Sequence, residues 1–181
     1  MDNKLPTYPR ILGIAPSPAG VGLAVIEGVN SLVGWDMKRV RENLNSGCMV
    51  KVEKAIDYYQ PHVIVMEDGS ERTSRHRTLM KRIVALARKR GVRVVVLSRK
   101  QVRGIFFSEG MGSKDALAEI LAQRFPEELG AHLPKKRRTS MSEDHRTAMF
   151  EAVALALAFR PCYVRMSVVD RGPMTASRGK S

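Results

Sequence analysis

Three acidic side chains stand where an acid is unusual in this sequence. Glu67 and Asp68 directly follow HVIVM (62–66), an apolar run of β-forming residues, and Glu151 opens EAVALALAF, an otherwise apolar helical stretch. Charged groups are rarely buried without a partner or a metal ion. Ligands of open α/β sheets gather at the carboxyl ends of strands. Because adjacent strand residues point to opposite faces, only one of Glu67 and Asp68 can face such a site, and we expect Glu67.

Carboxylates that gather from separate elements are typical of phosphodiester hydrolysis. Two divalent ions about 3.5–4 Å apart can activate a water and stabilise the leaving oxygen. Mg²⁺ prefers hard oxygen ligands and keeps several waters. Glu67 and Glu151 are therefore candidate ligands of such a site. Each of them can equally be a solvated acid or the partner of a nearby arginine, and the residues alone leave these alternatives open.

The charge balance points to a polyanionic partner. The chain has 31 Lys and Arg against 18 Asp and Glu, a net charge of +13. A basic surface attracts phosphate polymers through counterion release, which predicts a nucleic acid. The candidate nucleic-acid-binding residues form two groups, Arg75, Arg77, Lys81 and Arg82 in one and Lys135, Lys136, Arg137 and Arg138 in the other. The alternative for each group is a solvated surface without a specific partner.

The elements that position these residues follow from the spacing of the apolar side chains. Period-two and wholly apolar runs predict strands at 10–15, 21–27, 31–37, 62–66 and 92–97. Helical spacing and capping residues predict helices at 41–59, 74–90, 98–107, 114–125 and 143–159, with a polar loop at 127–141. Three strands in succession, followed by strands that alternate with helices, indicate a layered α/β fold with a mixed sheet.

A chain of 181 residues is expected to form one domain. We predict a lead-in at 1–9, the folded domain at 10–160 and a basic flexible tail at 161–181. The sequence has no run of 18 apolar residues and no apolar leader, so we expect no membrane partner. Cys48 and Cys162 match no metal spacing, which favours a reduced, cytoplasmic chain.

Four stretches, taken in order, resemble the RuvC-type Holliday-junction resolvases of the ribonuclease H superfamily. ILGIAPSPAGVGLAVIEG (11–28) resembles the family's opening hairpin, which normally reads G-I-D-P-G, and HVIVMED (62–68) resembles its second acidic strand. VRVVVLSRKQVRGIFFSEGMGSKDALAEIL (92–121) resembles its later strand, loop and lysine-bearing helix, and FEAVALALAF (150–159) resembles its closing helix. The resemblance covers about residues 10–160.

The resemblance implies a ribonuclease H-like three-layer fold. Its mixed five-stranded sheet has an antiparallel meander of three strands, then parallel strands, with helices on both faces. It also implies a metal-dependent, structure-selective endonuclease of DNA recombination that cuts branched DNA as a homodimer, with Mg²⁺ or Mn²⁺ as cofactor if the site is active.

Carried over residue by residue, the resemblance makes Glu67 and Glu151 catalytic metal ligands. It places Lys114 close to the lysine that contacts the scissile phosphate region, so Lys114 is a candidate for both catalysis and nucleic-acid binding. Asp144 lies two helical turns before Glu151 and is a weaker candidate for binding an ion.

Two positions depart from the family pattern, because Ala15 and Ala148 stand where the family has acids. A methyl group cannot coordinate a cation, so a symmetric two-metal site would lack half of its expected ligands. The sequence therefore predicts a RuvC-like nucleic-acid-binding protein more firmly than it predicts catalysis. The alternatives are an endonuclease with a reduced acid set, a catalytically inactive DNA- or RNA-binding protein, and a scaffold.

Overall fold

The computed structural model describes residues 5–6, 8–28, 30–70, 72–108, 112–135 and 144–169, with the backbone alone for 160–169. The strands are β1 (Ile11–Ser17), β2 (Gly20–Glu27), β3 (Ser31–Arg39), β4 (Val63–Glu67) and β5 (Arg93–Leu97). The helices are α1 (Leu44–Tyr59), α2 (Ser74–Lys89), α3 (Arg99–Phe106), α4 (Lys114–Arg124), α5 (Pro126–Leu129), the short 3₁₀ helix η1 (Gly130–His132) and α6 (Thr147–Val169). In this described part of the chain, no helix has the length and apolar character that crossing a membrane requires.

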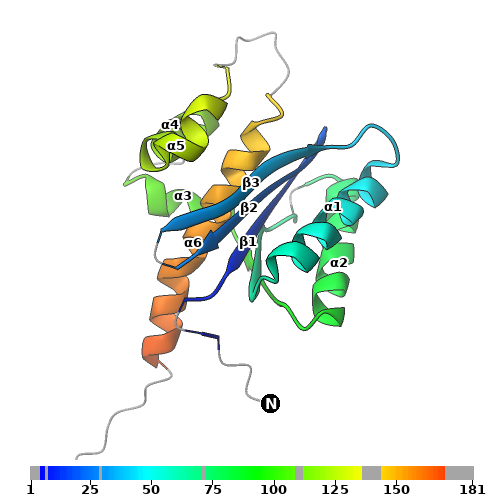
Figure 1. Ribbon diagram of the computed structural model, residues 1–181, viewed down its shortest axis with the longest axis horizontal. Helices are drawn as coiled ribbons and strands as arrows, with labels where there is room; N and C mark the ends of the chain where they lie inside the picture. Colours follow the sequence, from blue (N-terminus) through cyan, green and yellow to red (C-terminus); the bar gives the residue numbers. More distant parts are fainter. Residues whose placement is uncertain are drawn as a thin grey trace, which may run out of the picture.

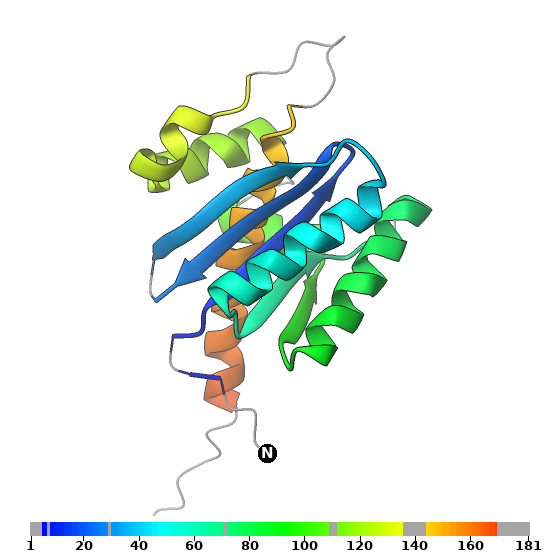
Figure 2. The same cartoon turned by 45° about the vertical axis from the view of Figure 1, so that its right-hand side comes forward.

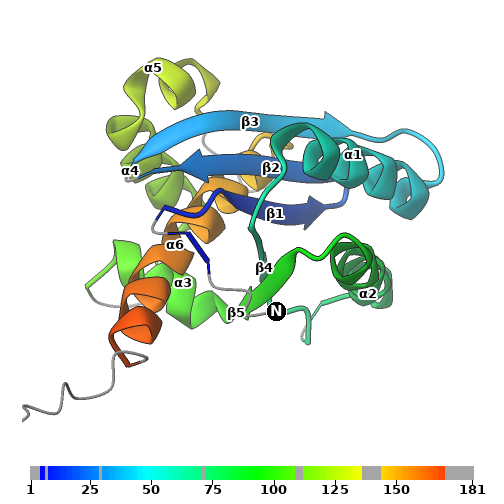
Figure 3. The ribbon, with the colours of Figure 1, turned by 60° about the horizontal axis from the view of Figure 1, so that its bottom comes forward.

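The five strands form one mixed sheet in the order β3-β2-β1-β4-β5. β1, β2 and β3 are an antiparallel meander, and β4 runs parallel to both β1 and β5. Helices α1 and α2 cover one face of the sheet, and α6 crosses the other face (Figures 1 and 2). Helices α3 and α4 pack against α6 (Figure 3). The predicted mixed five-stranded sheet between helical layers is confirmed.

The inner strands β1, β2 and β4 are buried on both faces of the sheet, whereas the edge strand β5 is only partly buried. Along β1, Leu12 and Ile14 belong to the core beneath α1 and α2, whereas Ile11 and Ala15 belong to the core beneath α6. This alternation follows from the pleat, which turns successive side chains to opposite faces. Ala15, two residues before the end of β1, therefore faces α6.

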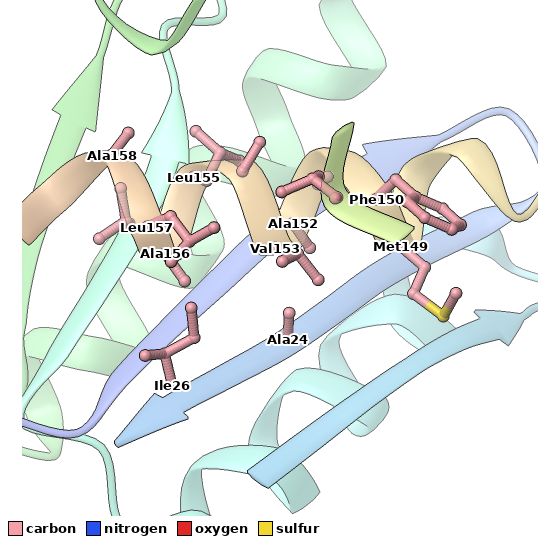
Figure 4. Packing of buried hydrophobic residues seen from close by; sticks show 14 of the residues in the cluster. Ala24, Ile26, Met149, Phe150, Ala152, Val153, Leu155, Ala156, Leu157 and Ala158 are labelled. Atoms are coloured by element: carbon pink, nitrogen blue, oxygen red, sulfur yellow. The ribbon is translucent and has the colours of Figure 1, made fainter. Parts of the chain in front are cut away.

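Helix α6 lies unusually close to β1 and β2 because glycines face it. A Cβ atom on Gly13 would lie 2.0 Å from the carbonyl oxygen of Ala152, and one on Gly22 would lie 2.1 Å from that of Ala148. The helix presents alanines to these strands, and Figure 4 shows Ala156 turned toward β2. This direct contact between backbones fixes how close α6 lies to the sheet. It therefore also fixes the position of Glu151, which directly precedes Ala152.

The structure differs from the sequence prediction around α6, which begins at Thr147 and not at 143. The carboxylate of Asp144 accepts a hydrogen bond from the backbone N–H of Arg146 at 2.9 Å. An aspartate that binds the chain two residues ahead stabilises a turn in competition with a helix. At its other end α6 continues to Val169, so the first part of the predicted tail (161–181) is helical and 170–181 lies outside the described residues.

The predicted polar loop at 127–141 is also partly wrong, because it contains α5 and η1. Pro126, the residue after the predicted helix at 114–125, starts α5. Proline suits the first position of a helix because its missing N–H would have no helical partner there.

Candidate functional site

A small pocket lies where the carboxyl ends of β1 and β4 meet α6. Ala15, Glu67, Arg72, Arg103 and Glu151 line it, together with His76 and apolar side chains of α3, α4 and α6. Its cavity volume is about 20 Å³, close to what one buried water molecule needs. Glu67 and Glu151, which are far apart in the sequence, therefore meet in one pocket with Ala15 beside them.

The strand register explains why Glu67 faces this pocket. β1 and β4 pair in parallel, with Ile14 opposite Met66, so the next residues, Ala15 and Glu67, lie side by side. Val65 belongs to the core beneath α6, and the pleat turns Glu67 to the same face. Asp68 accepts hydrogen bonds from the backbone N–H and hydroxyl of Ser70 at 3.0 and 2.9 Å, and it does not line the pocket.

Two arginines hold the carboxylate of Glu67. Nη2 of Arg72 lies 2.6 Å from Oε1 of Glu67, and Nη2 of Arg99 lies 3.3 Å from the same oxygen. Arg72 precedes α2, whose first turn is capped by the Thr73 hydroxyl. Arg99 is the first residue of α3, which begins with a capping box of Ser98 and Gln101. Local capping at two helix starts thus aims two guanidinium groups at one acid.

The charge state of Glu67 reflects these partners. Burial raises the pKa of the carboxyl group, but the hydrogen bond from Arg72 and the charges of Arg99 and Arg72 lower the pKa below its usual value on balance. The pKa of the neighbouring His76 is lowered by burial and by Arg72 and Arg75, so its ring adds no positive charge at neutral pH. Glu67 is therefore an ionised acid whose charge is already matched by arginine.

Glu151 is placed in a similar way. Nζ of Lys114 lies 3.2 Å from Oε1 of Glu151, and Nη2 of Arg103 lies 4.0 Å from it. Lys114 is the first residue of α4, which Ser113 caps through its hydroxyl, and Arg103 donates from Nη1 to the carbonyl of Ser113 at 3.3 Å. Lys114 therefore lies beside Glu151, where the sequence places the family's phosphate-contacting lysine.

Arg103 is the deepest cation of the pocket, with only 5% of its surface exposed. Burial lowers the pKa of its guanidinium group, while the charge of Glu151 opposes that change. An arginine nevertheless stays protonated in proteins. The floor of the pocket thus carries a permanent positive charge.

The residues of this pocket do not fit a pair of divalent ions. Among the residues that the structure describes, no group of three or more His, Cys, Asp and Glu side chains could hold a metal ion. Ala15 supplies only a methyl group, and Ala148 is buried under Gly22 and does not line the pocket. Glu67 and Glu151 already face cationic side chains. The Mg²⁺ or Mn²⁺ ions that the resemblance implies would have too few carboxylate ligands here, and the cations around those carboxylates would repel them.

Asp144 takes no part in the pocket. Its carboxylate accepts hydrogen bonds from Nε and Nη2 of Arg146, at 3.1 and 2.8 Å, and from the backbone N–H of Lys135 at 3.3 Å. The hydrogen bond from the Arg146 side chain is the main reason that the pKa of Asp144 lies far below its usual value. Asp144 joins the chain before residue 136 to the start of α6.

The Asp144→Asn variant should be less stable than the wild type at pH 7, by about 1–2 kcal/mol, because charged hydrogen bonds are lost. The folded pKa of Asp144 lies below its unfolded value, so this stability is present above about pH 4 and is lost as the pH falls through the folded pKa. Urea unfolding at pH 7 and at pH 3 measures the difference in unfolding free energy between the wild type and Asp144→Asn. This difference should be smaller at pH 3. Asp57→Asn, at an exposed ion pair with Arg90, is the control and should change stability little. A difference that stays constant with pH would contradict the prediction.

The other residues that were predicted to bind nucleic acid lie in different environments. Arg77, Lys81 and Arg82 are exposed on α2, and Lys135 is exposed before the segment at 136–143. Arg75 is half-buried and donates to the carbonyl of Ser17 at 2.9 Å, so it braces α2 against the turn between β1 and β2. Lys136, Arg137 and Arg138 lie outside the described residues.

Sequence reasoning missed two cations that line the pocket, Arg72 and Arg103, and a third, Arg99, that contacts Glu67 from outside the lining. Arg99 and Arg103 are four residues apart at the start of a helix that directly follows a strand. That spacing places both side chains on one face of the helix. The signal was present, but many other arginines in this basic chain offered similar spacings.

The structure is similar to solved structures of resolvases. A Thermus thermophilus RuvC structure matches with a TM-score of 0.61 and 18% identity over 87% of this chain and 96% of that one. T. thermophilus RuvC in complex with a Holliday junction substrate matches with a TM-score of 0.63 and 19% identity, over 88% of this chain and 96% of that one. Fowlpox virus resolvase, in complex with Holliday junction DNA, matches with a TM-score of 0.52 and 11% identity, over 84% of this chain and 99% of that one.

No protein-family model and no curated protein sequence matches this chain. At such low identities the structural matches establish the fold, and they cover 87% and 88% of this chain. The chain therefore has the ribonuclease H-like fold of the RuvC-type Holliday-junction resolvases, as its motifs predict.

Proposed function

We propose that this protein binds branched DNA and does not cleave it by two-metal hydrolysis. The observation that carries the proposal is the pocket at the ends of β1 and β4. Its two carboxylates, Glu67 and Glu151, are each paired with cations, and Ala15 stands where a further ligand would be needed. The fold is that of a nuclease, but the local charge favours a phosphate over a divalent cation.

Charge and structural likeness support branched DNA as the partner. The net charge is +13, and α2 presents exposed cations at Arg77, Lys81 and Arg82. Such residues position a nucleic acid through its phosphates without reading its sequence. Two of the similar structures are described as complexes with a Holliday junction. We extend that substrate class to this chain, and with it the homodimer that a symmetric four-way junction suits.

A gel-shift experiment with a labelled four-way junction tests the proposal. The matched competitor is a linear duplex of the same arm sequences, so that only the branch differs. We expect the junction to bind more tightly than the duplex. Raising the salt from 50 to 200 mM should weaken binding about 10³-fold if about six phosphates are contacted. Sedimentation of the complex measures how many protein chains bind each junction.

The same junction, incubated with Mg²⁺ or Mn²⁺, should remain uncut. Metal-dependent cleavage that disappears in a Glu67→Gln variant would instead establish an endonuclease with a reduced acid set. Failure to bind DNA or RNA at moderate salt would leave the scaffold as the better interpretation. Equal affinity for the junction and the duplex would retain DNA binding but contradict the preference for branched DNA.

A further inference from the structure

We propose that arginine and lysine groups around this pocket take the place of the metal ions that the resemblance implies, and that they bind one phosphate group of the DNA directly over the mouth of the pocket, without a divalent ion. The inference rests on the proposed DNA-binding function, which it deepens by naming the ligand and the residues of the site. The ligand is a single tetrahedral phosphate, too large for the cavity itself, and the residues that meet it are Arg72, Arg99 and Lys114, while the buried Arg103 adds positive charge to the floor beneath it.

The local charge favours an anion. Among the residues that the structure describes, four cations, Arg72, Arg99, Arg103 and Lys114, surround the two carboxylates of the pocket, Glu67 and Glu151. A surplus of positive charge in a partly buried pocket attracts anions and repels divalent cations, and the reduced exposure to water strengthens both effects.

The positions of the cations in their helices support the same conclusion. Arg99 is the first residue of α3 and Lys114 is the first residue of α4. A positive charge at a helix N-terminus opposes the helix dipole, whereas an anion there is stabilised by it. An anion at either helix start would interact favourably with the helix dipole and with the side chain there. Glu67 and Glu151 already supply such a negative charge to Arg99 and Lys114, and a phosphate would compete for the same two side chains.

The geometry of the arginines suits a phosphate. Guanidinium groups present several N–H donors in a planar fork that matches phosphate oxygens, which is why arginine recurs in phosphate recognition. Arg99 contacts Glu67 through Nη2, at the comparatively long distance of 3.3 Å, and its side chain is 41% exposed. Arg99 does not line the cavity itself, so its partly exposed guanidinium group lies at the edge of the pocket, beside Glu67.

Glu67 and Glu151 acquire a different role in this arrangement. In the absence of a ligand, each of them pairs with cationic side chains at the pocket. Their negative charge also opposes an incoming phosphate. The effect of Glu67→Gln on DNA affinity therefore distinguishes the two kinds of site. The substitution lowers the affinity if the site needs a metal ion, and it raises the affinity if cations alone bind the phosphate.

The experiment measures binding of the four-way junction, and separately of inorganic phosphate by calorimetry, both in EDTA. Wild-type binding to the junction should be the same in EDTA and in Mg²⁺. Glu67→Gln should bind about tenfold more tightly, since a like charge near the phosphate is removed. Arg99→Gln should bind about tenfold more weakly and lower the salt slope by about one.

Arg90→Gln is the matched control. Arg90 also pairs with two acids, Glu53 and Asp57, but it lies at the opposite end of α2 and does not line the pocket. This variant should leave junction binding unchanged. Circular dichroism of each variant confirms that it is folded before binding is compared.

The outcomes separate this inference from the function on which it rests. Junction binding that requires Mg²⁺, or that weakens in Glu67→Gln, would overturn the phosphate site while DNA binding stands. If the protein binds no DNA, but the wild type binds inorganic phosphate and Arg99→Gln does not, the pocket is a phosphate site and the DNA function falls. Junction binding equally unaffected in Arg99→Gln and Arg90→Gln would also overturn the inference.

Discussion

The Gly13→Ala variant is expected to lose about 3 kcal/mol of unfolding free energy, the upper end of the usual cost of overpacking a core. The added Cβ would lie 2.0 Å from the carbonyl oxygen of Ala152 and 3.1 Å from the backbone nitrogen of Ala156. These are backbone atoms of a buried helix, which cannot turn aside as a side chain can. α6 would have to shift by about 1 Å to reach the 3.0 Å that real contacts respect. Urea unfolding followed by circular dichroism measures the loss.

Gly104→Ala is the matched control. Gly104 lies within α3, and a Cβ there would meet nothing within 4 Å. Alanine in an exposed helix is favoured over glycine by about 1 kcal/mol, so this variant should be more stable than the wild type. If Gly13→Ala were as stable as the wild type, α6 could not lie against β1 as closely as described.

The second large effect is expected at Arg103. Arg103→Met should cost about 3 kcal/mol, the low end of the range for breaking a buried ion pair, since Lys114 still lies beside Glu151. Arg103 is 5% exposed, so methionine can occupy much of its volume, but it supplies neither the charge nor the hydrogen bond to the carbonyl of Ser113. Thermal and urea unfolding both measure this change.

A double variant tests whether the loss of stability in Arg103→Met comes from its ion pair with Glu151. Adding Glu151→Gln removes the carboxylate charge that Arg103 no longer balances. The double variant should therefore lose less unfolding free energy than the sum of the two single variants. Lys100→Met, an exposed cation on the same helix, should change stability by less than about 0.5 kcal/mol. Additive costs for Arg103→Met and Glu151→Gln would show that the two charges do not interact.

Much of the fold could be predicted because its signals are local. The apolar runs at 62–66 and 92–97 predicted buried strands, and both are strands of the sheet. The predicted burial is confirmed for β4 but wrong for β5, which lies at the edge of the sheet and leaves Val96 47% exposed. The start of α6 could not be predicted in the same way. Asp144 resembles a first-turn acid in sequence, but its carboxylate binds the backbone of Arg146 and holds a turn. Such a choice between turn and helix depends on tertiary neighbours.

The candidate site was predicted only in part. The acid positions at Glu67 and Glu151 followed from strand ends and from the family resemblance, and the structure brings both into one pocket. The cations that pair with these two acids could not be predicted, because the spacing of arginines in the sequence does not show which of them turn inward and which extend into water. Arg75 shows the difficulty: it was assigned to DNA, yet it binds the carbonyl of Ser17 and braces α2.

The ion pairs of the pocket also determine what an engineered acid would meet there. An Ala15→Asp change would add a carboxylate to a pocket that Arg72 and Glu67 line. The new acid would form another ion pair before it could bind a metal. A two-metal site therefore cannot be built on this chain one residue at a time: in design terms, the acids and the arginines around them must be exchanged together.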